Sequence, residues 1–207
     1  MNHKLEKTTF LKQLKESTWE QHLALEQTEL SQLLLSPTLG LEQYIHILYA
    51  FYGGFHPLES FLAEVLSLHK TAFRVEPRAS LALEDIRYLS GTWEPGLLPN
   101  EIPQVPSQPA TTPAALGTLY VLEGSRLGGK IISKQVSKSL GVTASEGGRF
   151  FAGTQGMESW KSFQENVESY VAQQPEAADD IIQSANDTFR RLRAYFILYY
   201  QLYLRQG

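Results

Sequence analysis

Apolar side chains recur at three- and four-residue steps through most of this chain, which is the spacing of one face of an α-helix. The first such stretch contains no Pro or Gly and extends from Glu6 to about Thr28. Its inward face is marked by Phe10, Leu11, Leu14, Thr18, His22 and Leu25. This pattern predicts one amphipathic helix with a histidine on its buried side.

The same periodicity predicts helices along the rest of the chain. They cover Leu39–His69, Ala79–Leu89, Ala114–Ser139, Glu158–Gln173 and Glu176–Leu204. Gly53, Gly54 and Pro57 interrupt the longest apolar stretch, so we expect it to form two helices end to end. Six prolines between Pro95 and Pro113 predict a long non-helical loop. Strand patterns are almost missing, which indicates an all-α fold, and we expect residues 1–207 to form a single domain.

The composition narrows the class of function. The 207 residues are 43% hydrophobic, contain no cysteine and carry a formal net charge of -4. An uninterrupted apolar run of membrane-spanning length and a secretory signal are both missing, so we expect a cytoplasmic protein without a membrane partner. Mixed charges give no basic footprint for nucleic acid. No glycine-rich phosphate fingerprint follows a strand, so a small molecule other than a nucleotide is the expected ligand.

His22 is the first candidate for chemistry. A half-buried imidazole is either a core histidine bonded to a nearby carbonyl or a ligand to something in a pocket. Glu26 follows one helical turn later, where its carboxylate can orient the imidazole as carboxylates do for metal-bound histidines. Lys15 precedes it by two turns, at a position suited to meet an acidic group of a ligand.

The second candidate is the segment GTLYVLEGSRLGGK, which places three glycines inside a predicted helix. Each glycine costs roughly 1 kcal/mol relative to alanine in a helix interior, so something should compensate for Gly124, Gly128 and Gly129. Two explanations remain open. One is close packing of another helix, and the other is close approach of the bare backbone to a flat ligand.

Charged positions downstream suggest weaker hypotheses. Lys130, Lys134 and Lys138 form a basic stripe, which is either a solvated helix face or a docking patch for an acidic electron-donor protein. Glu42 and His46 lie one turn apart and could share a non-heme iron, but such a site needs further pairs on facing helices.

At its first helix the chain resembles the heme oxygenases, biliverdin-producing enzymes with an all-helical fold, and in particular their small bacterial branch. The family carries its heme-ligating histidine in a pattern of Lys, Thr, His and Glu. Here that pattern is Lys15, Thr18, His22 and Glu26. The resemblance extends from about residue 8 to residue 200 and includes the segments SEGGRFFAGTQG and ANDTFRRLRAYF. It implies a single-domain fold with heme between a proximal and a distal helix.

The distal helix of the family carries the pattern Gly-x-x-x-Gly-Gly, which is similar to Gly124, Gly128 and Gly129 here. Animal-type members have an aspartate after the first of these glycines, where this chain has Ser125. The resemblance implies that the serine hydroxyl and backbone carbonyls order water over the iron instead. It further implies that Lys15, Arg126 and Lys161 contact the heme propionates and that Phe189 lines the pocket.

What the resemblance implies chemically is oxidative cleavage of heme to biliverdin, carbon monoxide and ferrous iron. Heme is then both cofactor and substrate, with His22 as the iron ligand, and the reaction uses oxygen and electrons from an external donor. The expected donor is a ferredoxin or a flavoprotein reductase that docks at Lys130, Lys134 and Lys138. The alternative is a non-catalytic heme carrier or sensor that has the same pocket.

Overall fold

The structure, a computed structural model, describes residues 9–99, 108–153 and 156–205. Over these ranges the chain is helical and contains no strand. The helices are α1 (Phe10–Glu26), α2 (Glu29–Leu34), α3 (Leu41–Leu68), α4 (Ala79–Ser90), α5 (Thr112–Leu140), α6 (Arg149–Ala152), α7 (Gly156–Gln173) and α8 (Ala178–Tyr203). Two short 3₁₀ helices, η1 (Pro95–Leu97) and η2 (Pro175–Ala177), complete the described elements. The all-α prediction is confirmed.

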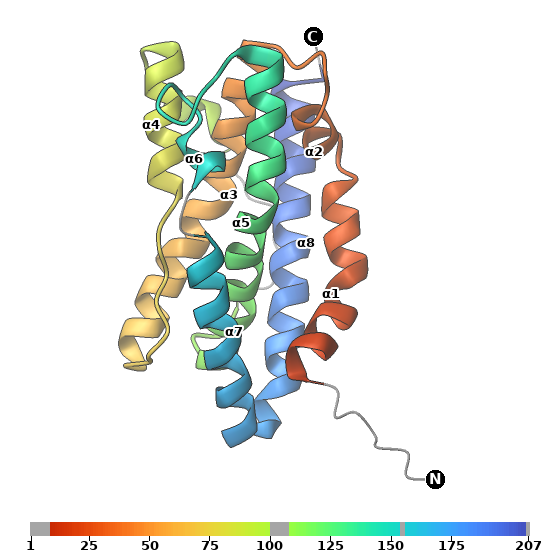
Figure 1. The fold of residues 1–207 in the computed structure, drawn as a ribbon, viewed down its shortest axis with the longest axis vertical. Coiled ribbons are helices and arrows are strands. Elements are labelled where there is room, and N and C mark those ends of the chain that lie inside the picture. Colours follow the sequence, from red (N-terminus) through yellow and green to blue (C-terminus); the bar gives the residue numbers. More distant parts are fainter. Residues whose placement is uncertain (1–8, 100–107, 154–155, 206–207) are drawn as a thin grey trace.

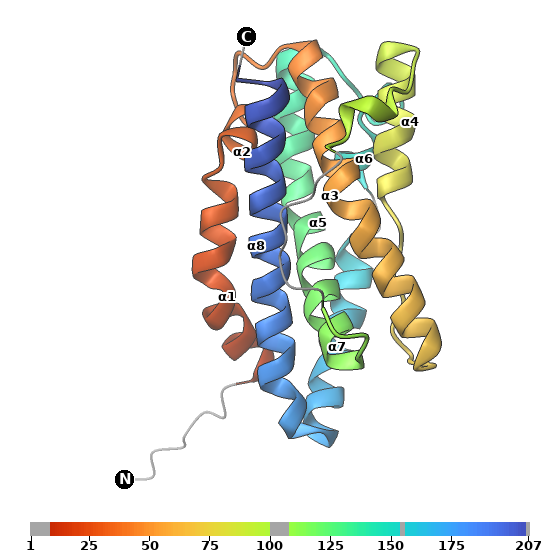
Figure 2. The same cartoon turned by 180° about the vertical axis from the view of Figure 1, so that it is seen from behind.

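α5 and α8 are two long helices that form the most extensive helix contact of the bundle. α5 packs most extensively on α8 and also contacts α3, α6 and α7, whereas α1 packs on α8 and α7. In Figure 1, α1 and α5 stand on either side of α8, and all three run in the same direction. The reverse view brings α8 to the front (Figure 2). α8 is therefore the wall against which the predicted proximal and distal helices are both held.

The division predicted within residues 39–69 is wrong, because α3 is one continuous helix that contains Pro57. A proline inside a helix removes one backbone hydrogen bond, and α3 continues through it. Both glycines instead serve packing. The hydroxyl of Tyr195 on α8 occupies the place where a Gly53 side chain would begin, and a Cβ on Gly54 would lie 3.1 Å from Leu192. The glycines let α8 approach α3 closely.

The other predicted helices are confirmed, with ends displaced by a few residues. Gly91 and Gly141 end α4 and α5 in the left-handed conformation that favours glycine. Sequence reasoning missed the short helices α2 and α6. It also placed Pro113 in the proline-rich loop, although this residue lies in the first turn of α5, where proline is tolerated. Residues 100–107 of that loop lie outside the described residues.

Three carboxylates, of which Glu59 and Asp85 are buried, fix helix starts. Glu168 on α7 accepts from the backbone N–H groups of Phe10 and Leu11 at 3.3 and 2.8 Å, which holds the start of α1. Glu59 does the same for α4, and Asp85 for α6. Burial raises the pKa of both Glu59 and Asp85, although the backbone donors oppose this effect. No helix in the described ranges is long and apolar enough to cross a membrane.

We predict that Gly117→Ala destabilises the protein and that Gly128→Ala does not. A Cβ at Gly117 would overlap the backbone of α8 at Ile181 and Ala185, whereas a Cβ at Gly128 would meet nothing within 4 Å. The first change should lower the free energy of unfolding by about 1–3 kcal/mol through overpacking. The second should raise it by up to about 1 kcal/mol, because alanine favours the helix. Urea unfolding followed by circular dichroism measures both, and equal losses would contradict the assignment.

Candidate functional site

His22 lies on α1 between two aromatic rings. The indole of Trp19 stacks on the imidazole with ring centroids 5.6 Å apart and an interplanar angle of 20°. Phe189 on α8 meets it edge-on, with centroids 5.6 Å apart and an angle of 84°. The predicted pocket aromatic Phe189 therefore contacts the predicted iron ligand directly. The contact with Phe189 places the imidazole of His22 next to α8, at the border of the core.

The two nitrogens of His22 lie in different environments. Nε2 is 3.5 Å from a carboxylate oxygen of Glu26, as the one-turn spacing predicts. Nδ1 is buried, and no hydrogen-bond partner for it exists among the described residues. A buried polar nitrogen without a partner costs free energy, so a core histidine should have found a carbonyl. The unpaired imidazole nitrogen therefore fits a ligand whose metal ion binds imidazole.

The three distal glycines have different surroundings. A Cβ on Gly129 would lie 2.5 Å from the carbonyl oxygen of Phe151, so this glycine is required by packing against α6. A Cβ on Gly124 would make ordinary contact with Trp160 at 3.8 Å, and one on Gly128 would meet nothing within 4 Å. Packing accounts for Gly129, while Gly128 opens onto free space. Close packing therefore explains Gly129, while the approach of a flat ligand stays a prediction for Gly128.

α5 approaches the N-terminal segment that contains α1 and α2 at two levels. The hydroxyls of Thr18 and Tyr120 are 3.5 Å apart at the lower level. At the upper level Gln135 on α5 donates to the carbonyl of Ser36, just after α2, at 3.2 Å. Between Tyr120 and Gln135 α5 rises about 22 Å. This stretch holds Gly128, and it is long enough for a flat ligand several rings wide.

The spacing along both helices brings the candidate residues to matching heights. Because α1 and α5 run in the same direction, one turn beyond the Thr18–Tyr120 contact reaches His22 on α1 and Gly124 on α5. A further turn reaches Glu26 and Gly128. The bare backbone of α5 and the imidazole of α1 thus lie at corresponding levels on the two sides of α8.

Ser125 is fully engaged as a donor. Its hydroxyl donates to the carbonyl of Leu122 at 2.7 Å and accepts from the guanidinium of Arg78 at 2.6 Å. Arg78 is 6% exposed and lies over the rings of Phe55 and Phe150, 5.2 and 4.9 Å from their centroids. Burial, with a contribution from nearby Arg126, lowers the pKa of Arg78 to about 10, so it stays charged at neutral pH.

Arg126 belongs to a second group of charged side chains, together with Glu123 and Glu76. Its guanidinium is 3.1 Å from the carboxylate of buried Glu123 and 3.7 Å from that of Glu76, and it donates to the Glu76 carbonyl. The hydroxyl of Ser159 on α7 donates to the same Glu123 carboxylate. With its side chain 8% exposed and paired in this way, Arg126 ties α5 to α7 and to the segment before α4.

The predicted propionate-binding lysines are both exposed. Lys15 lies on α1, two turns before His22, and Lys161 lies on α7, where its ammonium is 3.8 Å from a Glu165 carboxylate. The Lys161–Glu165 pair is well exposed and therefore weak, so either lysine remains available to an anionic ligand group.

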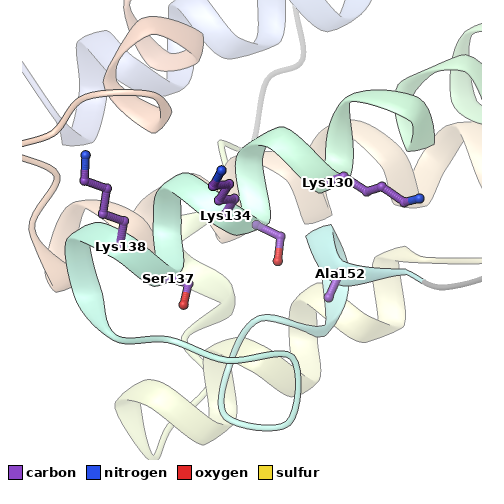
Figure 3. A pocket seen from close by; sticks show the side chains of 6 residues that line it. Lys130, Lys134, Ser137, Lys138 and Ala152 are labelled. Carbon is purple, nitrogen blue, oxygen red and sulfur yellow. The ribbon is translucent and has the colours of Figure 1, made fainter.

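The three lysines of the basic stripe are exposed on α5. With Ala152 of α6 they border a shallow surface depression (Figure 3). Lys134 and Lys138 project to the same side of the helix, while Lys130 points along it (Figure 3). In the described part of the chain, none of these three ammonium groups lies within ion-pair distance of a carboxylate.

Sequence reasoning missed Trp19, Arg78 and Tyr120. Trp19 falls outside the Lys-Thr-His-Glu pattern, and Arg78 lies in a connection far from the distal helix in sequence. Tyr120 could have been found, because it precedes Gly124 by one turn on the same face of α5.

His46 has a structural environment. Its Nδ1 lies 3.2 Å from the hydroxyl of Tyr199, and the ring stacks on Tyr203. Burial lowers the pKa of His46, against an opposing effect of Glu42 and Glu94. In residues 9–99, 108–153 and 156–205, no three His, Asp or Glu side chains gather as a metal site requires.

Comparisons with known proteins agree with this geometry. The structure is similar to a heme oxygenase from Leptospira interrogans, with 22% sequence identity and a TM-score of 0.69, over 92% of this chain and all of the other. A comparison with curated proteins gave no significant match. The sequence model of the heme oxygenase family matches residues 8–197. The chain therefore belongs to the heme oxygenase family and has its all-α fold.

Proposed function

We propose that this protein cleaves heme oxidatively to biliverdin, carbon monoxide and ferrous iron, with oxygen and electrons from an external donor. The observation that carries the proposal is the buried, partnerless nitrogen of His22 at the level where glycines bare the backbone of α5. Membership of the heme oxygenase family supports the same reading. A histidine and a bare helix face on two helices that flank the same helix, α8, suit a flat, iron-containing ligand.

His22 is the residue that would hold the heme iron. One imidazole nitrogen would bind the iron, and the other would donate its N–H, for which Glu26 is the nearest carboxylate. Phe189 closes the side of the ring that faces α8. Heme, when bound, supplies the iron at which oxygen is activated, and the protein supplies placement.

The opposite side of the ligand is assigned to α5. Gly124 and Gly128 place no side chain on this face of α5 and would leave room for oxygen there when heme is bound, whereas Gly129 keeps α5 against α6. A hydroxyl has one donor and two acceptor positions. The Ser125 hydroxyl donates to Leu122 and accepts from Arg78, so one acceptor position remains to hold a water. Arg78 fixes the orientation of that position.

Lys15 and Lys161 are proposed to pair with the propionates and to set the rotation of heme in the pocket. Arg126 is not assigned this role, because Glu123 and Glu76 already neutralise its guanidinium. The electron donor is proposed to be an acidic ferredoxin or flavoprotein reductase that docks on Lys130, Lys134 and Lys138.

A non-catalytic heme carrier or sensor is the second candidate. The specific observation in its favour is Ser125, because a hydroxyl bonded to Arg78 and Leu122 cannot take up and pass on a proton as a free carboxylate can. Such a protein would bind heme through His22 and leave it intact.

Incubation of the heme complex with ascorbate separates these functions. We expect loss of heme absorbance, a biliverdin band and release of carbon monoxide. His22→Ala should shift the Soret band and abolish turnover, since the iron loses its protein ligand. Persistent heme absorbance without pigment in the parent protein would refute the enzyme and leave the carrier. An unchanged Soret band in His22→Ala would refute the assigned ligand.

Gly128→Leu should slow heme degradation by at least tenfold or change the biliverdin isomer. The leucine side chain would project into the space that Gly128 leaves open, with no protein atom within 4 Å of its Cβ. Gly128→Ala is the matched control, because it adds the Cβ alone. Product analysis by chromatography reads the isomer. A normal rate and the same isomer in Gly128→Leu would show that heme does not bind beside this glycine.

Lys134→Glu should slow turnover driven by a protein reductase by about tenfold at low ionic strength, and less at high salt, because it reverses a charge in the basic stripe. Ascorbate-driven turnover should be unchanged, since ascorbate needs no docking surface. Lys12→Glu, on the exposed side of α1, is the control for net charge. Equal effects of Lys134→Glu in the two assays would remove the docking proposal.

A further inference from the structure

Trp19 is a large apolar side chain that the core does not use. It is 49% exposed and lies outside the hydrophobic core cluster, to which Phe10, Leu14 and Leu25 of α1 belong or against which they pack. Its ring contact is with His22, three residues later on the same helix. The position has no counterpart in the Lys15, Thr18, His22, Glu26 pattern. The interaction that can give Trp19 a role is therefore its contact with the imidazole of His22.

The imidazole needs an external restraint on its plane. Rotation about the bond between Cβ and the ring of a histidine has broad, shallow minima, so the side chain itself does not fix the orientation of the ring. Glu26 restrains it weakly, because its carboxylate is 59% exposed and lies 3.5 Å from Nε2, at the outer limit of a hydrogen bond.

The two aromatic neighbours supply that restraint from different directions. Trp19 lies nearly parallel to the imidazole, at 20°, and Phe189 lies nearly perpendicular to it, at 84°. A parallel face and a perpendicular edge cannot both keep their contacts if the imidazole turns. Phe189 is 6% exposed and held in the core, so Trp19 is the neighbour that closes the open side.

We propose that Trp19 is a positioning residue that fixes the plane of the His22 imidazole and, through it, the direction of the bond from nitrogen to iron. This inference rests on the proposed role of His22 as the heme ligand. It predicts that an aromatic ring at position 19 is required, whereas apolar volume alone is insufficient. Trp19→Leu removes the ring and keeps an apolar side chain, and Trp19→Phe keeps a ring.

The first measurement uses the heme-free protein. NMR relaxation of the carbon–hydrogen groups in the His22 imidazole reports the order of the ring. We expect a clear loss of order in Trp19→Leu and near-parent order in Trp19→Phe. Tyr88→Leu, which removes a 60% exposed aromatic on α4, is the control. Thermal unfolding of each variant should stay close to the parent, because Trp19 lies outside the core.

The second measurement uses the ferrous heme complex. Resonance Raman spectroscopy gives the stretching band of the bond between iron and the histidine nitrogen. Trp19→Leu should broaden or shift this band and weaken heme binding by about two- to tenfold, the range expected for loss of an aromatic pair. Trp19→Phe should restore both values. A merely structural role would change affinity and leave the band in place.

The outcomes separate this inference from the proposed function. Unchanged ring order in heme-free Trp19→Leu overturns the role of Trp19, whatever heme does. Disorder of the ring without any change in the iron–histidine band also overturns it. An iron–histidine band that survives His22→Ala refutes the proposed ligand, while the heme-free result still decides whether Trp19 holds the ring.

Discussion

The attachment of α1 and α5 to the same helix, α8, determines the site. α5 packs along α8 through the contact that Gly117 permits, and α1 packs on it through its own apolar face. The two helices then meet each other at Thr18 and Tyr120, and α5 meets the end of α2 near Ser36. Burial raises the pKa of the Tyr120 phenol, which stays neutral at this junction. Between these levels, His22 and Gly128 lie on the two helices that flank α8.

The glycines of α5 have two different structural roles. Gly117 and Gly129 bring neighbouring backbone into contact, so a side chain there would strain the fold. Gly124 and Gly128 have no such neighbour and give the helix a bare face. Arg78 donates to Ser125 in this stretch, and Arg126 pairs with Glu123 and Glu76. These contacts attach the glycine-containing stretch of α5 to the segment before α4.

Periodicity was sufficient to predict the all-α fold, because long amphipathic helices carry their signal locally. The prediction of a break at Gly53, Gly54 and Pro57 was wrong. Gly53 makes room for the phenol of Tyr195, which lies more than a hundred residues later and leaves no local signal. At the site, the one-turn spacing predicted the approach of Glu26 to His22. The hydrogen bond from Arg78 to Ser125 could not be predicted either, because it joins residues that are distant in the sequence. Arg126 was assigned by analogy, and its carboxylate partners appear only in three dimensions.

Nuclear magnetic resonance with a diamagnetic heme analogue tests the central claim most directly. Zinc protoporphyrin, added to the isotope-labelled protein, shifts the signals of protons that lie near its ring. The account predicts that the largest shifts fall on His22, Gly124 and Gly128, with small shifts at Lys134. Shifts concentrated on the basic stripe, or absent from α1, would contradict a ligand held between the histidine and the glycine face.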